Sequence, residues 1–371
     1  MGVDALPWRE AWHDALYAAG RGFYVTRGGP SAHFTTAAHG PTGRVLAEAV
    51  LALWATEHGA TPPSVVVDVG AGRGELTTHL LAALDDIDDL DPDDLGSRNG
   101  VAPSRDAPDR PDEAPSGSRY AVAPGHDGPP RPRVVAVDVV ERPAGLDERV
   151  EWLRSPGGAA LPPELSGLRD ALVVAHEWLD VVPCTVAEID ADGTAREVLV
   201  DPATGHESLG GPIAEADRRW AEAHWPTSTP GDRLEIGVTR DEAWGDLVSR
   251  VDEGTLLAVD YGHTARSRPS GGTLTAYAGG RQTTPLPDGS CDVTAHVAMD
   301  TLDADEVLTQ RDALRALGLR GATPPHALAT TDPLGYLAAL ERTSIEARLL
   351  APDGFGGFRW AVKRVRSHDV T

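Results

Sequence analysis

The pattern of apolar and polar residues along the chain predicts strands that alternate with helices. Four apolar runs end in turns: SVVVDVG, RVVAVDVVE, LVVAHEWLDVVP and GTLLAVDYG. Strands that are apolar on both faces belong in a parallel sheet covered by helices. Apolar residues recur at the spacing typical of an amphipathic helix over residues 5–19, 43–58, 304–317 and 332–349. The same spacing is found in ELTTHLLAAL, PIAEADRRWAEAH and RDEAWGDLVSRV. With FRWAVKRV as a late strand, this order predicts an α/β fold with a mostly parallel sheet.

Two segments depart from this alternation. TVAEIDADGTAREVLVD holds two alternating runs joined by Asp-Gly, which predicts a β-hairpin. Residues 85–132 are rich in Pro, Asp, Ser and Gly and cannot bury enough apolar surface to offset the entropy of ordering, so we expect a disordered insertion. The expected regions are an N-terminal helical and lid region (1–60), a first core half with the insertion (61–184), an inserted hairpin with helices (185–250) and a second core half (251–371).

Composition narrows the possible partners. The chain has 371 residues and a formal net charge of −24. Duplex nucleic acid and anionic membranes need clustered cations, so neither is expected as a partner. The sequence lacks a signal-peptide pattern and any run of about 18 apolar residues. Its two cysteines, Cys184 and Cys291, give no disulfide framework, which is typical of a cytoplasmic protein. The oligomeric state stays open.

The turn in VVVDVGAGRGELTTHL is the first candidate site. Its spacing is Asp68-x-Gly70-x-Gly72-x-Gly74, whereas a dinucleotide fingerprint would place its third glycine where the chain has Glu75. Carboxylates at 68 and 75 would repel a pyrophosphate. S-adenosylmethionine (SAM) has no phosphate and carries an ammonium and a sulfonium, so nearby acids favour it. The spacing is the one that class I methyltransferases use, and it predicts a SAM site here.

Another acid is expected to hold the ribose of the cofactor. Such an acid lies about 20 residues after the glycines, at the end of the next strand. Asp138 ends the strand VVAVD, and its separation from Gly74 approaches that value once the insertion is left out. The alternative is that Asp138 is an ordinary residue of a turn at the strand end.

Further stretches occur in one order between about residues 20 and 320: GFYVTRGGPSAHFTTAAHG, HEWLDVVP, DYG followed by GTLTAY, and DVTAHV. Together they resemble the MidA-like SAM-dependent methyltransferases, whose mitochondrial members act in respiratory complex I assembly. The resemblance implies a class I methyltransferase sheet, SAM as cofactor and arginine methylation. The chain departs from the family pattern at His33, where Asp is usual, at His176, where Asn is usual, and at Val181–Val182, where Ala-Leu is usual.

Acids after the apolar strands are candidates for holding the methyl acceptor. A guanidinium needs carboxylates to orient its fork and localise its charge, and Glu177 and Asp180 are the candidate catalytic residues. The alternative is that both cap a following helix. Asp260 and Tyr261 are weaker candidates for substrate contacts.

The N-terminal loop holds another pair of candidates. Thr35 and Thr36 are expected to close over SAM as part of a lid, with a plain loop role as the alternative.

No metal site is expected, because His176, His263 and His296 lack ligand spacing. Three functions remain. The first is a SAM-dependent methyltransferase acting on a protein side chain or a small molecule. The second is a non-catalytic assembly factor that keeps the fold. The third is a nicotinamide-dependent oxidoreductase, which Glu75 disfavours.

Overall fold

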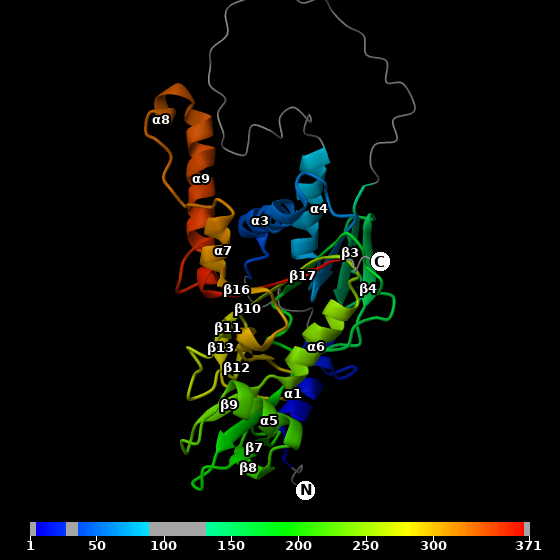
Figure 1. Ribbon diagram of the computed structural model, residues 1–371, viewed down its shortest axis with the longest axis vertical. Coiled ribbons are helices and arrows are strands. Elements are labelled where there is room, and N and C mark those ends of the chain that lie inside the picture. Colours follow the sequence, from blue (N-terminus) through cyan, green and yellow to red (C-terminus); the bar gives the residue numbers. More distant parts are fainter. Residues whose placement is uncertain (1–4, 27–35, 89–130, 367–371) are drawn as a thin grey trace, which may run out of the picture.

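A seven-stranded sheet forms the centre of the molecule in the computed structural model, which describes residues 5–26, 36–88 and 131–366 (Figure 1). Its strand order is β16-β17-β10-β5-β2-β3-β4. The bounds are β2 Val65–Val69, β3 Arg133–Asp138, β4 Val150–Arg154, β5 Ala171–His176, β10 Gly254–Asp260, β16 Glu306–Thr309 and β17 Arg359–Val365. Only β17 runs antiparallel to its neighbours. The predicted α/β fold with a mostly parallel sheet is confirmed.

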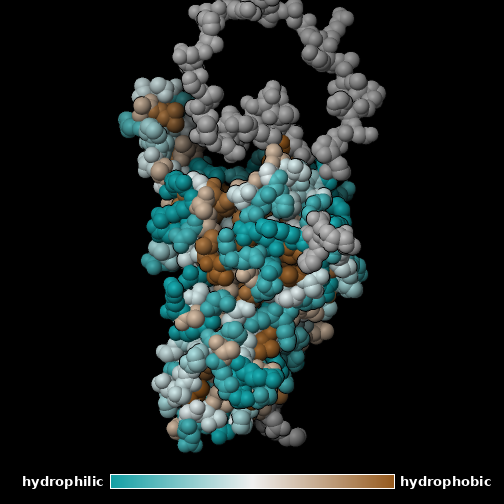
Figure 2. Space-filling model, in the orientation of Figure 1, coloured by the Kyte–Doolittle hydropathy of each residue, from teal (hydrophilic) through white to brown (hydrophobic). Residues whose placement is uncertain are grey.

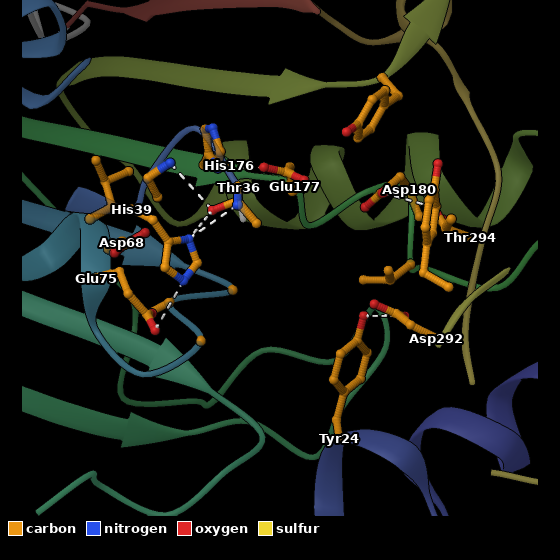
Figure 3. A pocket seen from close by; sticks show the side chains of 18 of the residues that line it. Tyr24, Thr36, His39, Asp68, Glu75, His176, Glu177, Asp180, Asp292 and Thr294 are labelled. Carbon is orange, nitrogen blue, oxygen red and sulfur yellow. Dashed lines mark hydrogen bonds and ion pairs between the residues drawn. The ribbon is translucent and has the colours of Figure 1, made fainter. Parts of the chain in front are cut away.

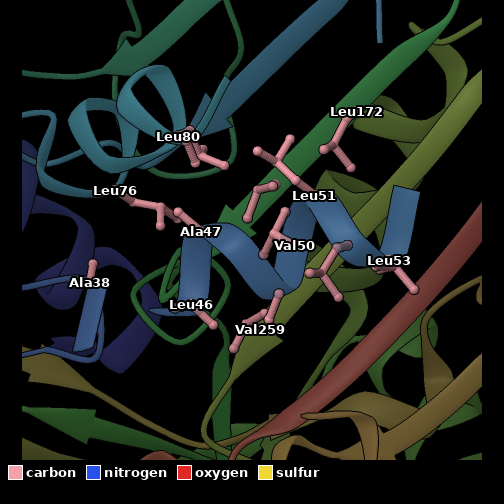
Figure 4. Packing of buried hydrophobic residues seen from close by; sticks show 14 of the residues in the cluster. Ala38, Leu46, Ala47, Val50, Leu51, Leu53, Leu76, Leu80, Leu172 and Val259 are labelled. Carbon is pink, nitrogen blue, oxygen red and sulfur yellow. The ribbon is translucent and has the colours of Figure 1, made fainter. Parts of the chain in front are cut away.

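Helices cover both faces of this sheet. Alternate strand residues such as Val66 and Leu172 pack against α3 (Gly40–His58), α4 (Glu75–Asp88) and α7 (Gln310–Ala316), as Figure 4 shows for part of this core. Val65 and Val67 face the other way, toward Trp244 of α6 (Val238–Ser249). This two-sided burial explains why the strands are apolar at every position.

A second, antiparallel sheet forms the lower part of Figure 1. Its order is β1-β7-β6-β9, with β8 paired to β7, and the bounds are β1 Leu6–Pro7, β6 Thr185–Ile189, β7 Ala195–Val200, β8 Glu207–Pro212 and β9 Arg233–Ile236. The predicted hairpin is confirmed as β6 and β7, with Gly193 at φ +78° in the connection. Helices α1 (Trp8–Tyr17) and α5 (Glu215–His224) pack against this sheet.

Short strands after β10 connect the two sheets. They are β11 (Gly262–His263) with β15 (Val297–Ala298), and β13 (Arg281–Thr283), β12 (Thr275–Ala278) and β14 (Asp292–Thr294) in that order. The buried carboxylate of Glu235 on β9 accepts the amides of Thr273 and Leu274 at 2.8 and 3.1 Å. The segment leading into β12 is therefore fixed to the second sheet.

Three expectations about element boundaries were wrong. Leu6–Pro7 form strand β1 along β7 rather than the start of a helix over 5–19. Residues 306–309 form strand β16 along β17 rather than part of a helix over 304–317, and α7 starts only at Gln310, where Thr309 accepts the amide of Asp312. Residues 85–88 of the expected insertion belong to α4, and Asp85 accepts two hydrogen bonds from Arg149. The stretch 89–130 lies outside the described residues.

The remaining elements are α2 (Phe23–Thr26), α8 (Leu328–Thr331) and α9 (Pro333–Leu349), with single 3₁₀ turns at Met299–Thr301 and Phe355–Gly357. Helices α8 and α9 project from the body, and hydrophobic residues gather near their tip in Figure 2, on a face that is otherwise mainly hydrophilic. In α9, Leu334 and Leu337 are exposed. In the part of the chain that the structure describes, no helix has the length and apolar character needed to cross a membrane.

Candidate functional site

A cavity of about 240 Å³ opens where β2, β5 and β10 end, on the side of their carboxyl ends. This is the place where the strand order reverses, because β3 and β4 follow β2 on one side while β5 and β10 lie on the other. Ligands of open α/β sheets bind at such a point. A smaller cavity of about 60 Å³ lies toward β3 and shares Gly70, Gly72 and Glu177 with the first.

The glycine turn separates the two cavities. Gly70 and Gly72 have φ values of +75° and +61°, in the left-handed region that favours glycine. A Cβ on Gly70 would lie 3.1 Å from the Cβ of Trp178. Gly74 lines neither cavity and instead packs closely against Leu146. The turn therefore brings bare backbone to both cavities at Gly70 and Gly72.

The amides of the glycine turn are engaged within the protein. Those of Gly70 and Ala71 donate to the carbonyl of Val137 at 2.9 and 3.1 Å, and that of Gly72 donates to Asp138 Oδ2 at 2.8 Å. Asp138 Oδ1 accepts the amide of Val140 at 3.1 Å, and the residue lines the smaller cavity. The structure thus brings the predicted ribose acid directly beside the glycine turn.

Buried acids surround this end of the cavity. Asp68 Oδ2 accepts the hydroxyl of Thr77 at 2.6 Å, and burial raises the pKa of Asp68 to about 7. Burial also raises the pKa of Asp138 to about 6, although the backbone amides that it accepts oppose this shift. Glu75 is the first residue of α4, where the positive end of the helix favours a carboxylate.

The segment before α3 closes the same end of the cavity. Thr36 donates its amide to Nδ1 of His39 at 3.1 Å, and its hydroxyl lies 2.8 Å from the same nitrogen. His39 Nε2 lies 3.7 Å from Glu75 Oε1. Thr36 lines the cavity as expected. Thr35 lies outside the described residues, as does His33.

Three carboxyl groups face the opposite end of the cavity (Figure 3). Glu177 is one of only two described non-glycine residues with positive φ, at +53°, and its Oε1 has no hydrogen-bond partner. Asp180 accepts the hydroxyl of Thr294 on Oδ2 at 2.7 Å, whereas its Oδ1 has no partner. Asp292 accepts the hydroxyl of Tyr24 at 2.7 Å. The geometry brings Glu177 and Asp180 together, as the sequence predicted.

Asp260 lies beneath these groups rather than in the cavity. It is completely buried, and its Oδ2 accepts the amides of Leu179 and Asp180 at 3.0 and 3.1 Å. Residues 177–184 form turns, so the alternative in which Glu177 and Asp180 cap a helix is wrong. Tyr261, the other weak candidate, lines the cavity and contacts Phe358.

The electrostatics of this end favour a cation. Burial raises the pKa of Glu177 and that of Asp260 well above their usual values, and neighbouring carboxylates raise them further. Burial also raises the pKa of Asp292, to about 8. The Asp180 pKa is raised too, although the Thr294 hydroxyl and the buried Arg240 guanidinium oppose the shift. A positive charge entering here would stabilise the ionised carboxylates.

Sequence reasoning missed several groups that line the cavity. Tyr24, His39, Asp292 and Thr294 all fall within motif stretches, but their spacing pointed to no role. Their contribution depends on segments that meet only in the folded chain. Within residues 5–26, 36–88 and 131–366, no group of three or more His, Cys, Asp or Glu is placed to hold a metal ion.

Comparison with known proteins identifies the class of site. The model of the family described as "Putative S-adenosyl-L-methionine-dependent methyltransferase" matches residues 129–319, just over half of the chain, and the chain belongs to this family. The MidA-like proteins are part of it, so the resemblance is confirmed. The protein is therefore a methyltransferase that uses SAM, as the glycine turn predicted. The oxidoreductase and non-catalytic alternatives are set aside.

Two solved structures from Burkholderia thailandensis share the fold. One is an uncharacterised protein, 21% identical, with a TM-score of 0.64, covering 97% of this chain and 87% of its own. The other belongs to the same superfamily and is bound to S-adenosyl-homocysteine; it is 21% identical, with a TM-score of 0.66, covering 96% of this chain and 87% of its own. No curated protein matches the chain.

The residues at the glycine turn fit SAM. Neither Arg nor Lys is among the described residues that line the two cavities, so nothing there would neutralise a pyrophosphate. Asp68, Glu75 and Asp138 instead supply oxygen acceptors for a cationic nucleoside cofactor. Gly70 lines both cavities with bare backbone, and a Cβ there would press against Trp178.

Proposed function

We propose that this methyltransferase transfers a methyl group to a cationic side chain of a protein, with the arginine guanidinium as the favoured acceptor. The observation that carries the proposal is the pair of unpartnered oxygens on Glu177 and Asp180 at the cavity wall, with Asp292 alongside. Buried carboxylates without partners are costly, and a planar guanidinium offers several N–H donors and a positive charge to them. Arginine is also the acceptor that the MidA-like resemblance implies.

The cofactor roles follow from the two cavities. The nucleoside would lie in the smaller cavity, where Asp138 can accept the ribose hydroxyls. The amino-acid part would pass Gly70 and Gly72 into the larger cavity, near Asp68. Thr36 would close over it. Gly74 supports the turn by packing and makes no cofactor contact in this proposal.

When bound, SAM supplies a methyl group on a positively charged sulfur. Glu177 and Asp180 orient the acceptor nitrogen toward that methyl group, since positioning provides most of the acceleration in such a displacement. The proton released when the nitrogen is methylated passes to Glu177 Oε1, which accepts no hydrogen bond in the structure although His176 Nδ1 lies 3.4 Å from it. Asp260 acts as a positioning residue, because it holds the amides of Leu179 and Asp180.

Location and acceptor size are also part of this proposal. A cytoplasmic location is supported by Cys184 and Cys291, which are both free thiols. A small cationic molecule would meet the same carboxylates as a protein side chain, so the experiment has to report the size of the product.

The test is a labelling experiment on lysate from cells that lack this protein. The purified protein is added with SAM carrying a heavy methyl group, and mass spectrometry locates the label. We expect heavy methyl on arginine of one or a few proteins. Label only on lysine, on a neutral side chain or on a small molecule would contradict the arginine proposal. Absence of both label and SAM binding by calorimetry would contradict the cofactor site.

A further inference from the structure

The glycine turn leaves no amide between Gly70 and Gly74 for the carboxylate of the cofactor. Gly70, Ala71 and Gly72 donate as described above. The amide of Arg73 donates to Glu75 Oε2 at 2.9 Å, and that of Gly74 donates to the carbonyl of Ala71 at 2.7 Å. The described residues that line the cavity include neither Arg nor Lys. The α-carboxylate of SAM therefore needs a different donor.

His39 carries such a donor at the cavity wall. Its Nδ1 accepts the amide of Thr36, so in the neutral ring the proton lies on Nε2. Nε2 is buried and has no hydrogen-bond partner, because Glu75 Oε1 at 3.7 Å is beyond hydrogen-bond distance. Figure 3 shows this nitrogen directed toward Glu75 across the cofactor end of the cavity.

The other unpartnered ring nitrogen in the cavity has the opposite character. His176 Nε2 is also buried without a partner, but Nδ1 of the same ring lies 3.4 Å from Glu177 Oε1. When Glu177 is ionised, the proton of the neutral ring stays on Nδ1, and Nε2 offers only a lone pair. His176 is therefore unsuited to a carboxylate, whereas His39 presents an unpartnered N–H at the glycine-turn end.

We infer that His39 and Glu75 together clamp the zwitterionic amino-acid part of the cofactor. The carboxylate accepts from His39 Nε2, and the ammonium donates to Glu75 Oε1. These two atoms are close enough to be spanned by the neighbouring charged groups on one α-carbon. The pair joins the segment before α3 to the first residue of α4. The inference rests on the proposed placement of SAM beside the glycine turn.

The clamp is tested by matching each side chain to one group of the ligand. Calorimetry measures the affinity of S-adenosyl-homocysteine, of its decarboxylated analogue and of its deaminated analogue. For His39→Ala we expect affinity for S-adenosyl-homocysteine to fall about 10- to 100-fold, as for a lost hydrogen bond to a charged group. Affinity for the decarboxylated analogue should stay within about twofold. Glu75→Gln should show the same pattern with the deaminated analogue.

Two further variants guard against a merely structural effect. His39→Gln keeps an N–H donor on a side chain of similar reach and should restore most of the affinity. His206→Ala, at an exposed site in the turn between β7 and β8, is the matched control and should bind like the wild type. Thermal unfolding of each variant checks that the protein is folded.

The outcomes separate the clamp from the proposed function. If wild-type protein binds no S-adenosyl-homocysteine, the cofactor site itself is wrong. If wild-type protein binds but His39→Ala loses equal affinity for all three ligands, His39 only shapes the loop and the clamp is overturned. Unchanged affinity in a folded His39→Ala variant overturns it as well.

Discussion

At the glycine-turn end of the cavity, each amide from Gly70 to Gly74 donates to an acceptor inside the protein. At the opposite end, Glu177 and Asp180 each keep an oxygen that has no hydrogen-bond partner, as does Asp260 in the layer beneath them. At the first end the backbone of the turn is fully paired before any ligand binds, and His39 Nε2 is the buried polar atom left without a partner. The second holds buried acids whose pKa values are raised, which is costly without a compensating charge.

This difference matches two kinds of binding. A cofactor that is always the same can be held by a rigid turn whose backbone is fixed in advance. A charged acceptor is better held by groups that gain their partners only when it arrives, because the interaction then favours the acceptor complex. Strongly perturbed carboxylates in a cavity also mark functional sites more often than structural ones.

The largest expected effect comes from Gly72→Val at the rigid end. A β-branched residue at φ +61° is strained by about 1–3 kcal/mol, and its side chain enters the cofactor path. We expect SAM affinity to fall at least about a hundredfold by calorimetry, since every 1.4 kcal/mol is tenfold. Gly59→Val is the control, because Gly59 has φ +69° at the end of α3 with open space around it. It should lose stability but keep SAM affinity; equal affinities in both folded variants would contradict the cofactor site.

Glu177→Gln examines the end of the cavity that Glu177, Asp180 and Asp292 line, which we call the acceptor end. The exchange keeps size but removes the charge that orients the acceptor, so turnover should fall by about 2–4 kcal/mol, or ~30- to 1000-fold. SAM affinity should change by less than about threefold, because the residue serves the acceptor. Glu151→Gln, exposed on β4 beside Arg133, is the matched control for turnover.

Other results would reassign Glu177. Loss of SAM binding in a folded Glu177→Gln variant would make this residue a cofactor ligand. The two ends of the cavity would then not serve cofactor and acceptor separately. Unchanged binding and turnover would leave Asp180 as the better candidate for holding the acceptor.

Asp292→Asn tests whether the acceptor end is costly when empty. Burial raises the pKa of Asp292 to about 8 in the folded protein, well above its value in the unfolded chain. The protonated carboxyl therefore contributes to the free energy of unfolding. This contribution is fully present below about pH 4 and is lost as pH rises through 8. Wild-type protein should therefore lose stability relative to Asp292→Asn, by as much as roughly 1.4 kcal/mol per pH unit in that window. Urea unfolding at pH 5 and pH 7.5 measures this.

The control for the pH effect is Asp14→Asn, at an exposed site beside Arg21. It should show no comparable pH dependence. If the difference in free energy of unfolding between wild type and Asp292→Asn is the same at both pH values, the pKa of Asp292 is not raised in the folded protein. Asp292 is then not one of the buried acids that destabilise the empty cavity.

Most of the glycine-turn end of the cavity was predictable from sequence, apart from His39, and the opposite end was so only in part. Strand β2, the glycine turn and α4 follow from alternation and spacing over about 20 residues, all local signals. Asp138 could be placed because it ends the next strand of the sheet. The pair of Tyr24 and Asp292 joins positions 268 residues apart, and no periodicity in the chain connects them.

Errors in element assignment have the same origin. Residues 306–309 carry a helical pattern, yet they form β16 because β17 offers them an antiparallel partner about 50 residues later. Tertiary pairing overrides local propensity in such segments. The acceptor end is likewise assembled from α2, the loop after β5 and strand β14, so its composition emerges only from the fold.

The smallest expected effect is that of Tyr24→Phe, which asks whether Asp292 belongs to the acceptor end at all. The tyrosine hydroxyl donates to Asp292 at 2.7 Å and lowers the pKa of its carboxyl, opposing the effect of burial. Its loss should raise that pKa further, so that ionising Asp292 beside an arriving cationic acceptor costs more at pH 7 than in the wild type. We expect KM for the acceptor protein found by labelling to rise about 3- to 10-fold, as for one lost hydrogen bond of 0.5–1.5 kcal/mol, with kcat and SAM affinity unchanged. Well above pH 8 the carboxyl ionises in the wild type and increasingly in the variant, so the difference in KM should shrink. Tyr336→Phe on α9 is the matched control and should leave KM unchanged. A KM that does not change at pH 7 would remove Asp292 from the groups that contact the acceptor and leave Glu177 and Asp180.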